Sequence, residues 1–149
     1  MSEWIADEEW ETIVRNVPIV SVDLVVETPA GLVLGKRANE PAKGEWFVPG
    51  GRVRKGEKLE AAVHRIAREE LAVNVDIKST LGTYGHFYER SEVGTSKHYV
   101  AHGYHVRTGE TELKSDSQHR ALSVFETRPE NIHEYVKQYL AAADLTTLP

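Results

Sequence analysis

The chain has 149 residues, 23 acidic and 18 basic side chains, a formal net charge of −5 and no cysteine. The length and ordinary apolar share predict one domain over residues 1–149, and the charge balance argues against a general nucleic-acid binder. The lack of cysteine excludes disulfides, cysteine zinc sites and thiol nucleophiles. Because no leader pattern and no apolar run of about 18–20 residues is visible, we expect a soluble cytoplasmic protein that does not enter a membrane.

Hydrophobic periodicity and turn residues divide the chain into short helices and strands, without a repeat or a linker. In chain order, the pattern predicts a helix over 7–16, strands over 19–26, 32–36 and 45–48, a helix over 57–72, strands over 73–77, 82–88, 98–106 and 122–125, and a helix over 129–143. Asp7 is the expected N-cap of the first helix, and Pro129 is expected to open the last. This order predicts an α+β fold, with a mixed sheet between helices.

The predicted helix over 57–72 carries a carboxylate where its apolar face continues. Four apolar side chains share that face: Leu59, Val63, Ile66 and Ala67. The next position on it is Glu70, and a buried carboxylate must be paired, hydrogen-bonded or bound to metal. Gly50 and Gly51, just upstream, let backbone atoms approach a ligand closely. The pattern therefore favours a site for a hard cation such as Mg²⁺ or Mn²⁺, and the alternative is that Glu69 and Glu70 are solvated helix-end residues.

These residues resemble the signature of the Nudix hydrolases, G-x5-E-x7-R-E-U-x-E-E-x-G-U, in which U is a bulky apolar residue. Five fixed positions agree, namely Gly51, Glu57, Arg65, Glu69 and Glu70. Two differ, because Ile66 stands in place of a glutamate and Ala72 in place of the last glycine. In ordinary Nudix enzymes the missing glutamate belongs to the acidic group that binds metals or orients water. Its loss argues against ordinary attack at phosphorus.

A narrower family, the GDP-mannose mannosyl hydrolases, has an apolar residue at that place. The similarity runs from about Glu8 to Phe125, and the stretches that resemble the family include 34–37, 46–53, 59–62, 86–88, 98–100 and 118–119. The resemblance implies a Nudix fold and a Mg²⁺-dependent enzyme, with Mn²⁺ as the other candidate cation. It implies hydrolysis of GDP-mannose, or of GDP-glucose, to GDP and free sugar by water attacking the sugar C1 with inversion.

The same resemblance assigns roles to individual residues. The metal would be held by the Gly51 carbonyl, Glu70 and Gln118, with Glu69 leaving room for a second metal site. The imidazole of His119 would be the general base, because its ordinary pKa suits proton removal from water at neutral pH. The residues expected at the diphosphate or the sugar are Arg37, Arg52, Tyr99, Asp23 and His86. The family also suggests a homodimer.

Each assignment has a purely structural alternative. Arg37 could be an exposed cation at a strand end, His119 a solvated loop residue, and Asp23 the partner of a neighbouring lysine or arginine. Trp4 and Trp10 fit core or dimer contacts better than a base-stacking platform. The histidines at 98, 102 and 105 share a strand, but their spacing fits no strong zinc pattern.

Two other functions compete with cleavage at carbon. A conventional pyrophosphohydrolase would attack phosphorus with Glu69 and Glu70, but Ile66 and the Gln118-His119 pair argue against it. A non-hydrolytic nucleotide-sensing module is disfavoured because the chain keeps its acidic residues and His119.

Overall fold

The computed structural model describes residues 5–37, 43–109 and 120–143. Within these ranges one sheet has the order β3-β2-β1-β6-β5, with β4 paired to β1 and β7 paired to β2. The elements are α1 (Asp7–Asn16), β1 (Ile19–Thr28), β2 (Gly31–Arg37), β3 (Trp46–Phe47), β4 (Gly50–Arg52), α2 (Leu59–Leu71), β5 (Asp76–Tyr88), β6 (Lys97–Arg107), β7 (Arg120–Phe125) and α3 (Glu134–Ala142). No helix in these ranges has the length and apolar character that a membrane crossing requires.

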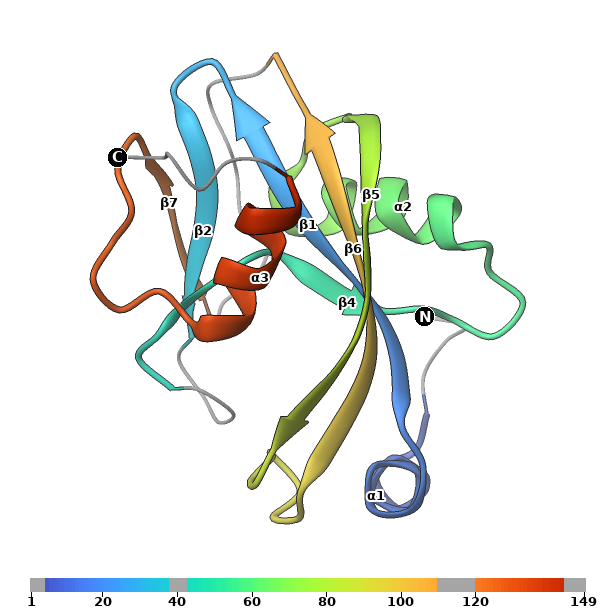
Figure 1. The fold of residues 1–149 in the computed structure, drawn as a ribbon. Helices are drawn as coiled ribbons and strands as arrows, with labels where there is room; N and C mark the ends of the chain where they lie inside the picture. The colour runs from blue at the N-terminus through green and yellow to red at the C-terminus, as the bar shows by residue number, and fades with distance from the viewer. Residues whose placement is uncertain (1–4, 38–42, 110–119, 144–149) are drawn as a thin grey trace.

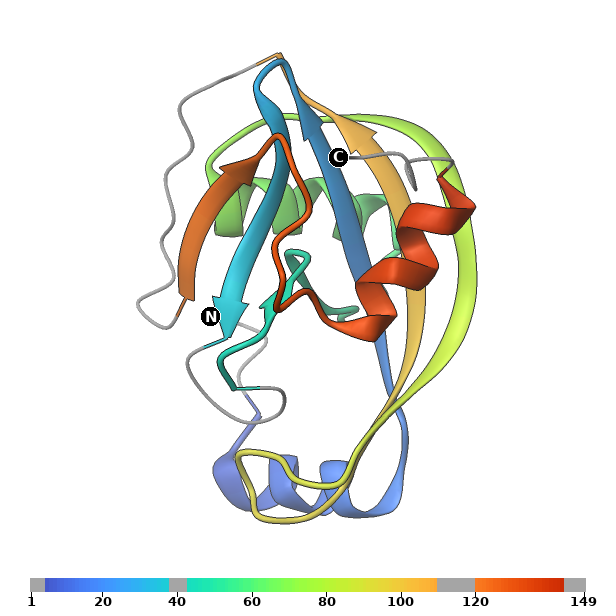
Figure 2. The same cartoon turned by 60° about the vertical axis from the view of Figure 1, so that its left-hand side comes forward.

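The sheet lies between two helices, as predicted. Figures 1 and 2 show α2 behind the strands and α3 in front of them. One apolar cluster packs under α2 and includes Val22 and Leu24, whereas the other packs under α3 and includes Val25. Successive side chains of a strand point to opposite faces, so Asp23, between Val22 and Leu24, is on the α3 face. This alternation decides which residues of β1 can contribute to a site.

The central pairing of the sheet is parallel. β1 and β6 run side by side, with Ile19 opposite Tyr99 and Asp23 opposite Gly103. The remaining ladders are antiparallel, including the predicted hairpin of β1 and β2. In the hairpin turn, the Thr28 hydroxyl accepts hydrogen bonds from the backbone N–H groups of Ala30 and Gly31 at 3.1 Å.

Helix α2 confirms the predicted apolar face and corrects its ends. Val63, Ile66 and Ala67 are buried in the cluster between α2 and the sheet, and Leu59 packs against that cluster. The helix begins at Leu59, so Glu57 lies before it and not in its first turn. At its other end Ala72 is left-handed, with φ 57° and ψ 36°. Glycine adopts this conformation without strain, which explains why the Nudix pattern has glycine there.

Several other predicted boundaries are wrong. Of the strand predicted over 73–77 only residues 76–77 are in a strand, and they continue through 82–88 as the single strand β5, whose pairing with β6 shifts register around Ile77 to Thr83. Helix α3 starts at Glu134 rather than at Pro129, because the His133 side chain accepts a hydrogen bond from the Tyr135 N–H and caps it. Ala6, and not Asp7, is the N-cap of α1. Residues 50–52, which the pattern leaves outside any element, form a short strand, β4, paired to β1.

Candidate active site

A cavity of about 240 Å³ opens on the α3 face of the sheet, where β1, β6, β5 and β4 come together. Five of the predicted site side chains line it: Asp23, Arg37, Arg52, His86 and Tyr99. Gly51 also lines it, together with Trp10, Ile19, Ser21, Phe47, Val48, Gly50 and Tyr88. The structure therefore gathers in one cavity residues that the sequence separates by up to about 90 positions.

Asp23 is the acidic group of this cavity. It is only 8% exposed, and its Oδ2 accepts a hydrogen bond of 2.6 Å from the Tyr139 hydroxyl. Gly50 leaves room for the carboxylate, since a Cβ at that position would lie 2.4 Å from Asp23 Oδ1. A buried carboxylate held in this way is a hydrogen-bond acceptor in a fixed place. One donor to this carboxylate is a tyrosine, a residue type that the structural alternative for Asp23 did not include.

Arg52, Trp10 and Tyr99 form a cationic and aromatic part of the cavity wall, and Lys97 packs against its two rings. The Arg52 guanidinium carbon lies 5.9 Å from the centroid of the Trp10 ring. The Lys97 ammonium lies 5.4 Å from that centroid and 5.2 Å from the centroid of Tyr99. Trp10 is therefore part of the cavity wall and belongs to neither apolar cluster, whereas a dimer contact of Trp10 stays a prediction, and Trp4 lies outside the described residues.

Glu92 connects this wall to the loop between β5 and β6. Both of its carboxylate oxygens accept hydrogen bonds from the Lys97 ammonium at 2.9 Å, and Oε2 also accepts one of 3.2 Å from the indole N–H of Trp10. Partial burial is the largest single influence and raises the pKa of Glu92, but the hydrogen bonds from Lys97, the backbone and Trp10, together with the charge of Lys97, outweigh it and keep that pKa below its usual value. The hydrogen bond to Glu92 therefore helps to fix the Trp10 indole in the cavity wall.

Two further side chains of β5 bring uncharged polar groups to the cavity. Burial lowers the pKa of His86 to about 4, so the imidazole is neutral at physiological pH. Its ring lies flat on that of Tyr135, with centroids 3.8 Å apart and an angle of 2°. Its Nε2 is buried and has no hydrogen-bond partner among the described residues. Burial, reinforced by the charge of Asp23, raises the pKa of Tyr88, which therefore keeps its proton.

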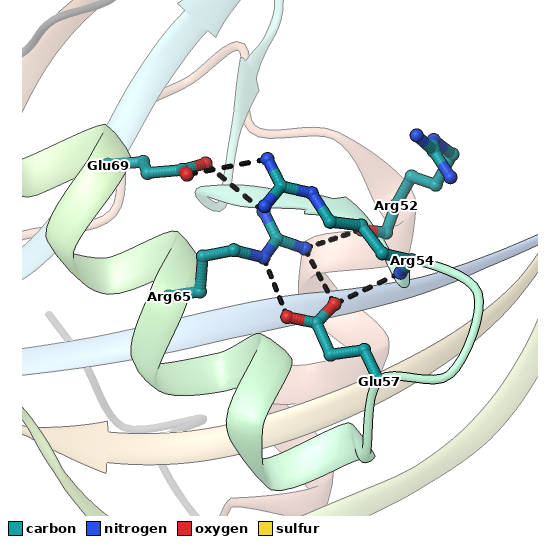
Figure 3. A network of polar contacts seen from close by, with 5 residues as sticks. All are labelled: Arg52, Arg54, Glu57, Arg65 and Glu69. Atoms are coloured by element: carbon teal, nitrogen blue, oxygen red, sulfur yellow. Dashed lines mark hydrogen bonds and ion pairs between the residues drawn. The ribbon is translucent and has the colours of Figure 1, made fainter. Parts of the chain in front are cut away.

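The motif arginine Arg65 joins helix α2 to the loop after β4 (Figure 3). Its guanidinium donates to both oxygens of Glu57, at 2.7 and 2.9 Å, and to the backbone oxygen of Arg52 at 2.9 Å. The hydrogen bond from Arg65 lowers the pKa of Glu57, and one of 3.0 Å from the Arg54 N–H adds to it. Figure 3 shows the Arg52 side chain extending away from this network. The network therefore anchors the backbone of Arg52 and leaves its guanidinium at the cavity.

Glu69 belongs to the same network. Its carboxylate is 3.1 Å from Arg65 Nη1 and 3.5 Å from Arg54 Nη2, and its side chain is 48% exposed. A metal ion bound to Glu69 would have to compete with these two guanidinium groups. Its role as a second metal ligand stays a prediction.

Ile66 occupies the place where the Nudix pattern has a glutamate. It is 2% exposed, and its Cδ1 would lie 3.1 Å from a Cβ built on Gly51, so the side chain packs directly beneath the glycine loop. Glu70 is one turn further along the same helix and is half-buried. The assignment of the Gly51 carbonyl and the Glu70 carboxylate as cation ligands stays a prediction. Oxygen donors of this kind fit Mg²⁺ or Mn²⁺.

Two predicted residues, Gln118 and His119, lie outside the described residues. Their assignments as metal ligand and general base stay predictions. Among the described residues no group of three histidine, aspartate or glutamate side chains is placed to hold a metal. The three histidines of β6 have other contacts. His98 stacks on Phe87, whereas His102 and His105 are hydrogen-bonded to Thr83 and Glu27.

The fold and the geometry of the motif can be compared with those of a known protein family. A model of the NUDIX domain matches residues 17–145, and the chain belongs to the Nudix family. Membership supports hydrolase activity, and members of this family generally use divalent cations such as Mg²⁺ or Mn²⁺.

Two relatives with assigned names are similar to this chain, one over most of its length and the other over less than half. The low-salt glycan biosynthesis protein Agl8 of Haloferax volcanii is 54% identical over 142 residues, which cover 94% of this chain and 91% of Agl8. An ADP-ribose pyrophosphatase of Methanocaldococcus jannaschii is 43% identical over 67 residues, which cover 45% of this chain and 40% of that protein.

A solved structure confirms the fold. The MutT NUDIX hydrolase of Burkholderia pseudomallei superposes with a TM-score of 0.71 and 26% identity, over 84% of this chain and 97% of that one. The MutT protein of Methanosarcina mazei follows with a TM-score of 0.67 and 20% identity, over 85% of this chain and 94% of that one.

Proposed function

We propose that this protein hydrolyses a GDP-hexose, GDP-mannose or GDP-glucose, to GDP and free sugar, with water attacking the sugar C1. The observation that carries the proposal is the burial of Ile66 beneath Gly51, where the Nudix pattern has a metal-site glutamate. The cavity beside Gly51 also supplies groups that suit both halves of the substrate. Arg37 and Arg52 suit a diphosphate, and Asp23 and His86 suit sugar hydroxyls.

In the proposed reaction, the water oxygen forms a bond to C1 while the bond from C1 to the diphosphate oxygen breaks. The water proton passes to the imidazole of His119, and the electron pair of the broken bond leaves with GDP. Attack from the side opposite the diphosphate inverts the anomeric centre. Because the leaving group is already anionic, it needs charge stabilisation more than a general acid.

The chain's own residues supply part of that stabilisation. Arg37 and Arg52 would bind phosphate oxygens through their planar guanidinium groups, and the Tyr99 hydroxyl would donate to the leaving phosphate. A Mg²⁺ held by the Gly51 carbonyl, Glu70 and Gln118 would neutralise charge on the diphosphate when bound. Arg65 on α2 donates to the Arg52 backbone oxygen and to Glu57, and so keeps β4 and the loop after it against α2. This network therefore fixes the backbone that carries Arg52 relative to the helix that carries Glu70.

The Haloferax volcanii relative is compatible with this substrate class. Its name refers to glycan biosynthesis, and glycans are assembled from activated sugars. The partial relative named ADP-ribose pyrophosphatase favours the alternative, attack at phosphorus of a nucleoside diphosphate derivative. That alternative would require Glu69 and Glu70 to act without a carboxylate at position 66.

Hydrolysis in ¹⁸O-labelled water separates these functions. Label in the free sugar supports attack at carbon, and label in a phosphate product supports attack at phosphorus. No turnover of any nucleotide sugar would favour a non-hydrolytic sensing module. The test uses GDP-mannose and GDP-glucose with Mg²⁺, and mass spectrometry of both products.

Two variants test the assigned roles. His119→Gln should lower kcat by about 10²- to 10⁴-fold if His119 is the base, whereas a loss of less than about tenfold would remove it from that role. Glu70→Gln should abolish most metal-dependent activity. Near-normal activation by Mg²⁺ in that variant would contradict the assignment of Glu70 as a ligand.

A further inference from the structure

Helix α3 reaches the cavity through one buried hydroxyl. Tyr139 is fully buried at 0% exposure, and its hydroxyl donates to Asp23 Oδ2 at 2.6 Å. Burial, together with the charge of Asp23, raises the pKa of Tyr139, so the phenol remains a protonated donor at neutral pH. Among the described residues, those that line the cavity include Asp23 but not Tyr139. The hydroxyl therefore acts on the cavity through the carboxylate.

The sheet is shaped to admit the Tyr139 ring. The register of β1 and β6 puts Gly103 beside Asp23. A Cβ on Gly103 would lie 2.4 Å from Tyr139 Cε1, so a side chain there would displace the ring. Gly50 does the same for the carboxylate, because a Cβ there would lie 2.4 Å from Oδ1. Two glycines, one on each of two strands that pair with β1, thus make space for this one hydrogen-bonded pair.

A second tyrosine of α3, Tyr135, packs against His86, the polar side chain next to Asp23. Tyr135 stacks on His86, whose Nδ1 is 3.9 Å from Asp23 Oδ2. The Tyr135 hydroxyl also accepts from the Phe87 N–H at 3.0 Å and donates to the Phe87 carbonyl at 3.2 Å. Helix α3 is therefore attached to β5 next to His86 and to β1 at Asp23. Its docking and the geometry of the two polar groups depend on each other.

We propose that Tyr139 is a positioning residue, which holds the Asp23 carboxylate in the orientation that accepts a hydroxyl of the substrate's sugar. This inference rests on the proposed function, because it takes the sugar half of a nucleotide sugar as the partner of Asp23. A carboxylate has about four acceptor sites, so a hydrogen bond from Tyr139 orients the group without using its whole acceptor capacity. A group that is already oriented needs no rearrangement when the ligand binds, which strengthens the interaction.

The test deletes one oxygen atom and compares two ligands. Tyr139→Phe keeps the ring that packs on Gly103 and removes the hydroxyl. We expect KM for GDP-mannose to rise about tenfold, the scale of one weakened hydrogen bond to a charged group, while the inhibition constant of GDP changes less than about twofold. Tyr104→Phe is the matched control, since Tyr104 is 5% exposed and belongs to the apolar cluster under α2. It should change neither constant.

A double-mutant cycle separates positioning from a general structural effect. In the Asp23→Asn background, Tyr139→Phe should change KM for GDP-mannose less than about twofold, because the oriented carboxylate is already gone. An equal effect in both backgrounds would overturn the proposal. So would a Tyr139→Phe variant that keeps wild-type KM, or one that loses GDP and GDP-mannose affinity in parallel.

Two further measurements keep the proposal testable, one without turnover and the other without the variant. If the wild-type protein releases no free sugar, the proposed function fails by itself. Calorimetric titration of GDP-mannose and GDP then replaces KM, and equal affinity of wild type and Tyr139→Phe for GDP-mannose refutes the positioning role. If Tyr139→Phe does not fold, the hydroxyl proton of Tyr139 is followed by NMR in the wild type. It should shift with GDP-mannose and not with GDP, and an unchanged resonance with GDP-mannose refutes the proposal.

Discussion

The left-handed residue at the end of α2 predicts a gain in stability from a substitution to glycine. Ala72 has φ 57° and ψ 36°, and its N–H is bonded to the carbonyls of Ala67 and Arg68. An L-residue in this conformation costs about 1–2 kcal/mol. Glycine avoids that cost but gives the unfolded chain about 0.4–1 kcal/mol of extra entropy. Because Ala72 is exposed, its methyl group packs against little, and we expect a net gain of about 0.5–1 kcal/mol for Ala72→Gly.

The assay is thermal or urea unfolding of purified variants. For a chain of this size the gain corresponds to about 1–4 °C in Tm. The matched control is Ala61→Gly, the same change at an exposed position inside α2, which should lose about 0.5–1 kcal/mol. The two substitutions must therefore have opposite signs. If Ala72→Gly destabilises the protein as Ala61→Gly does, the strain argument is wrong.

Three further predictions concern the site. Arg65 lowers the pKa of Glu57, so Glu57→Gln should cost about 1–2 kcal/mol at neutral pH, and urea unfolding should show this difference vanish as the pH falls through that lowered pKa. The imidazole resonances of His86 should titrate near pH 4 by NMR, and a midpoint near 6.5 would contradict its burial. Because the unfolded chain binds this proton near pH 6.5, the free energy of unfolding should decrease as the pH is lowered from about 6.5 to about 4. Gly50→Ala should displace the Asp23 carboxylate and raise KM for GDP-mannose about tenfold or more in steady-state assays, and wild-type kinetics would show that the cavity tolerates the methyl group.

Periodic patterns predicted the parts of the fold in which one face decides the packing. The buried face of α2 follows from the spacing of Val63, Ile66 and Ala67, and the motif then sets its rotation. Boundaries that depend on a single contact were not visible. The start of α3 is set by a cap from His133, and β4 exists because Gly51 pairs with Val22 on β1. Two glycines in sequence indicate a turn unless the neighbouring strand is known.

The residues of the cavity also divide into those that a sequence motif can predict and those that depend on a single distant contact. The family motif and the resemblance named Asp23, Arg37, Arg52, His86 and Tyr99, and the structure places all five at one cavity. Trp10 and Tyr139 were missed for different reasons. Trp10 sits on an amphipathic helix, where its spacing indicates a core position equally well. Tyr139 follows Asp23 by 116 residues, and no periodicity connects a helix residue to a strand residue at that distance.

The dependence of Asp23 on α3 has a consequence for how the protein is made. Strand β1 leaves the ribosome long before α3 is synthesised, and its parallel neighbour β6 also comes much later in the chain. Contacts between such distant segments form late in folding, because the closure of a long loop costs entropy before it is rewarded. The Asp23 carboxylate thus receives its donor when the last helix docks. If Asp23 has its proposed role, we expect a newly made chain to complete its ligand-binding geometry only after α3 has been synthesised and has docked.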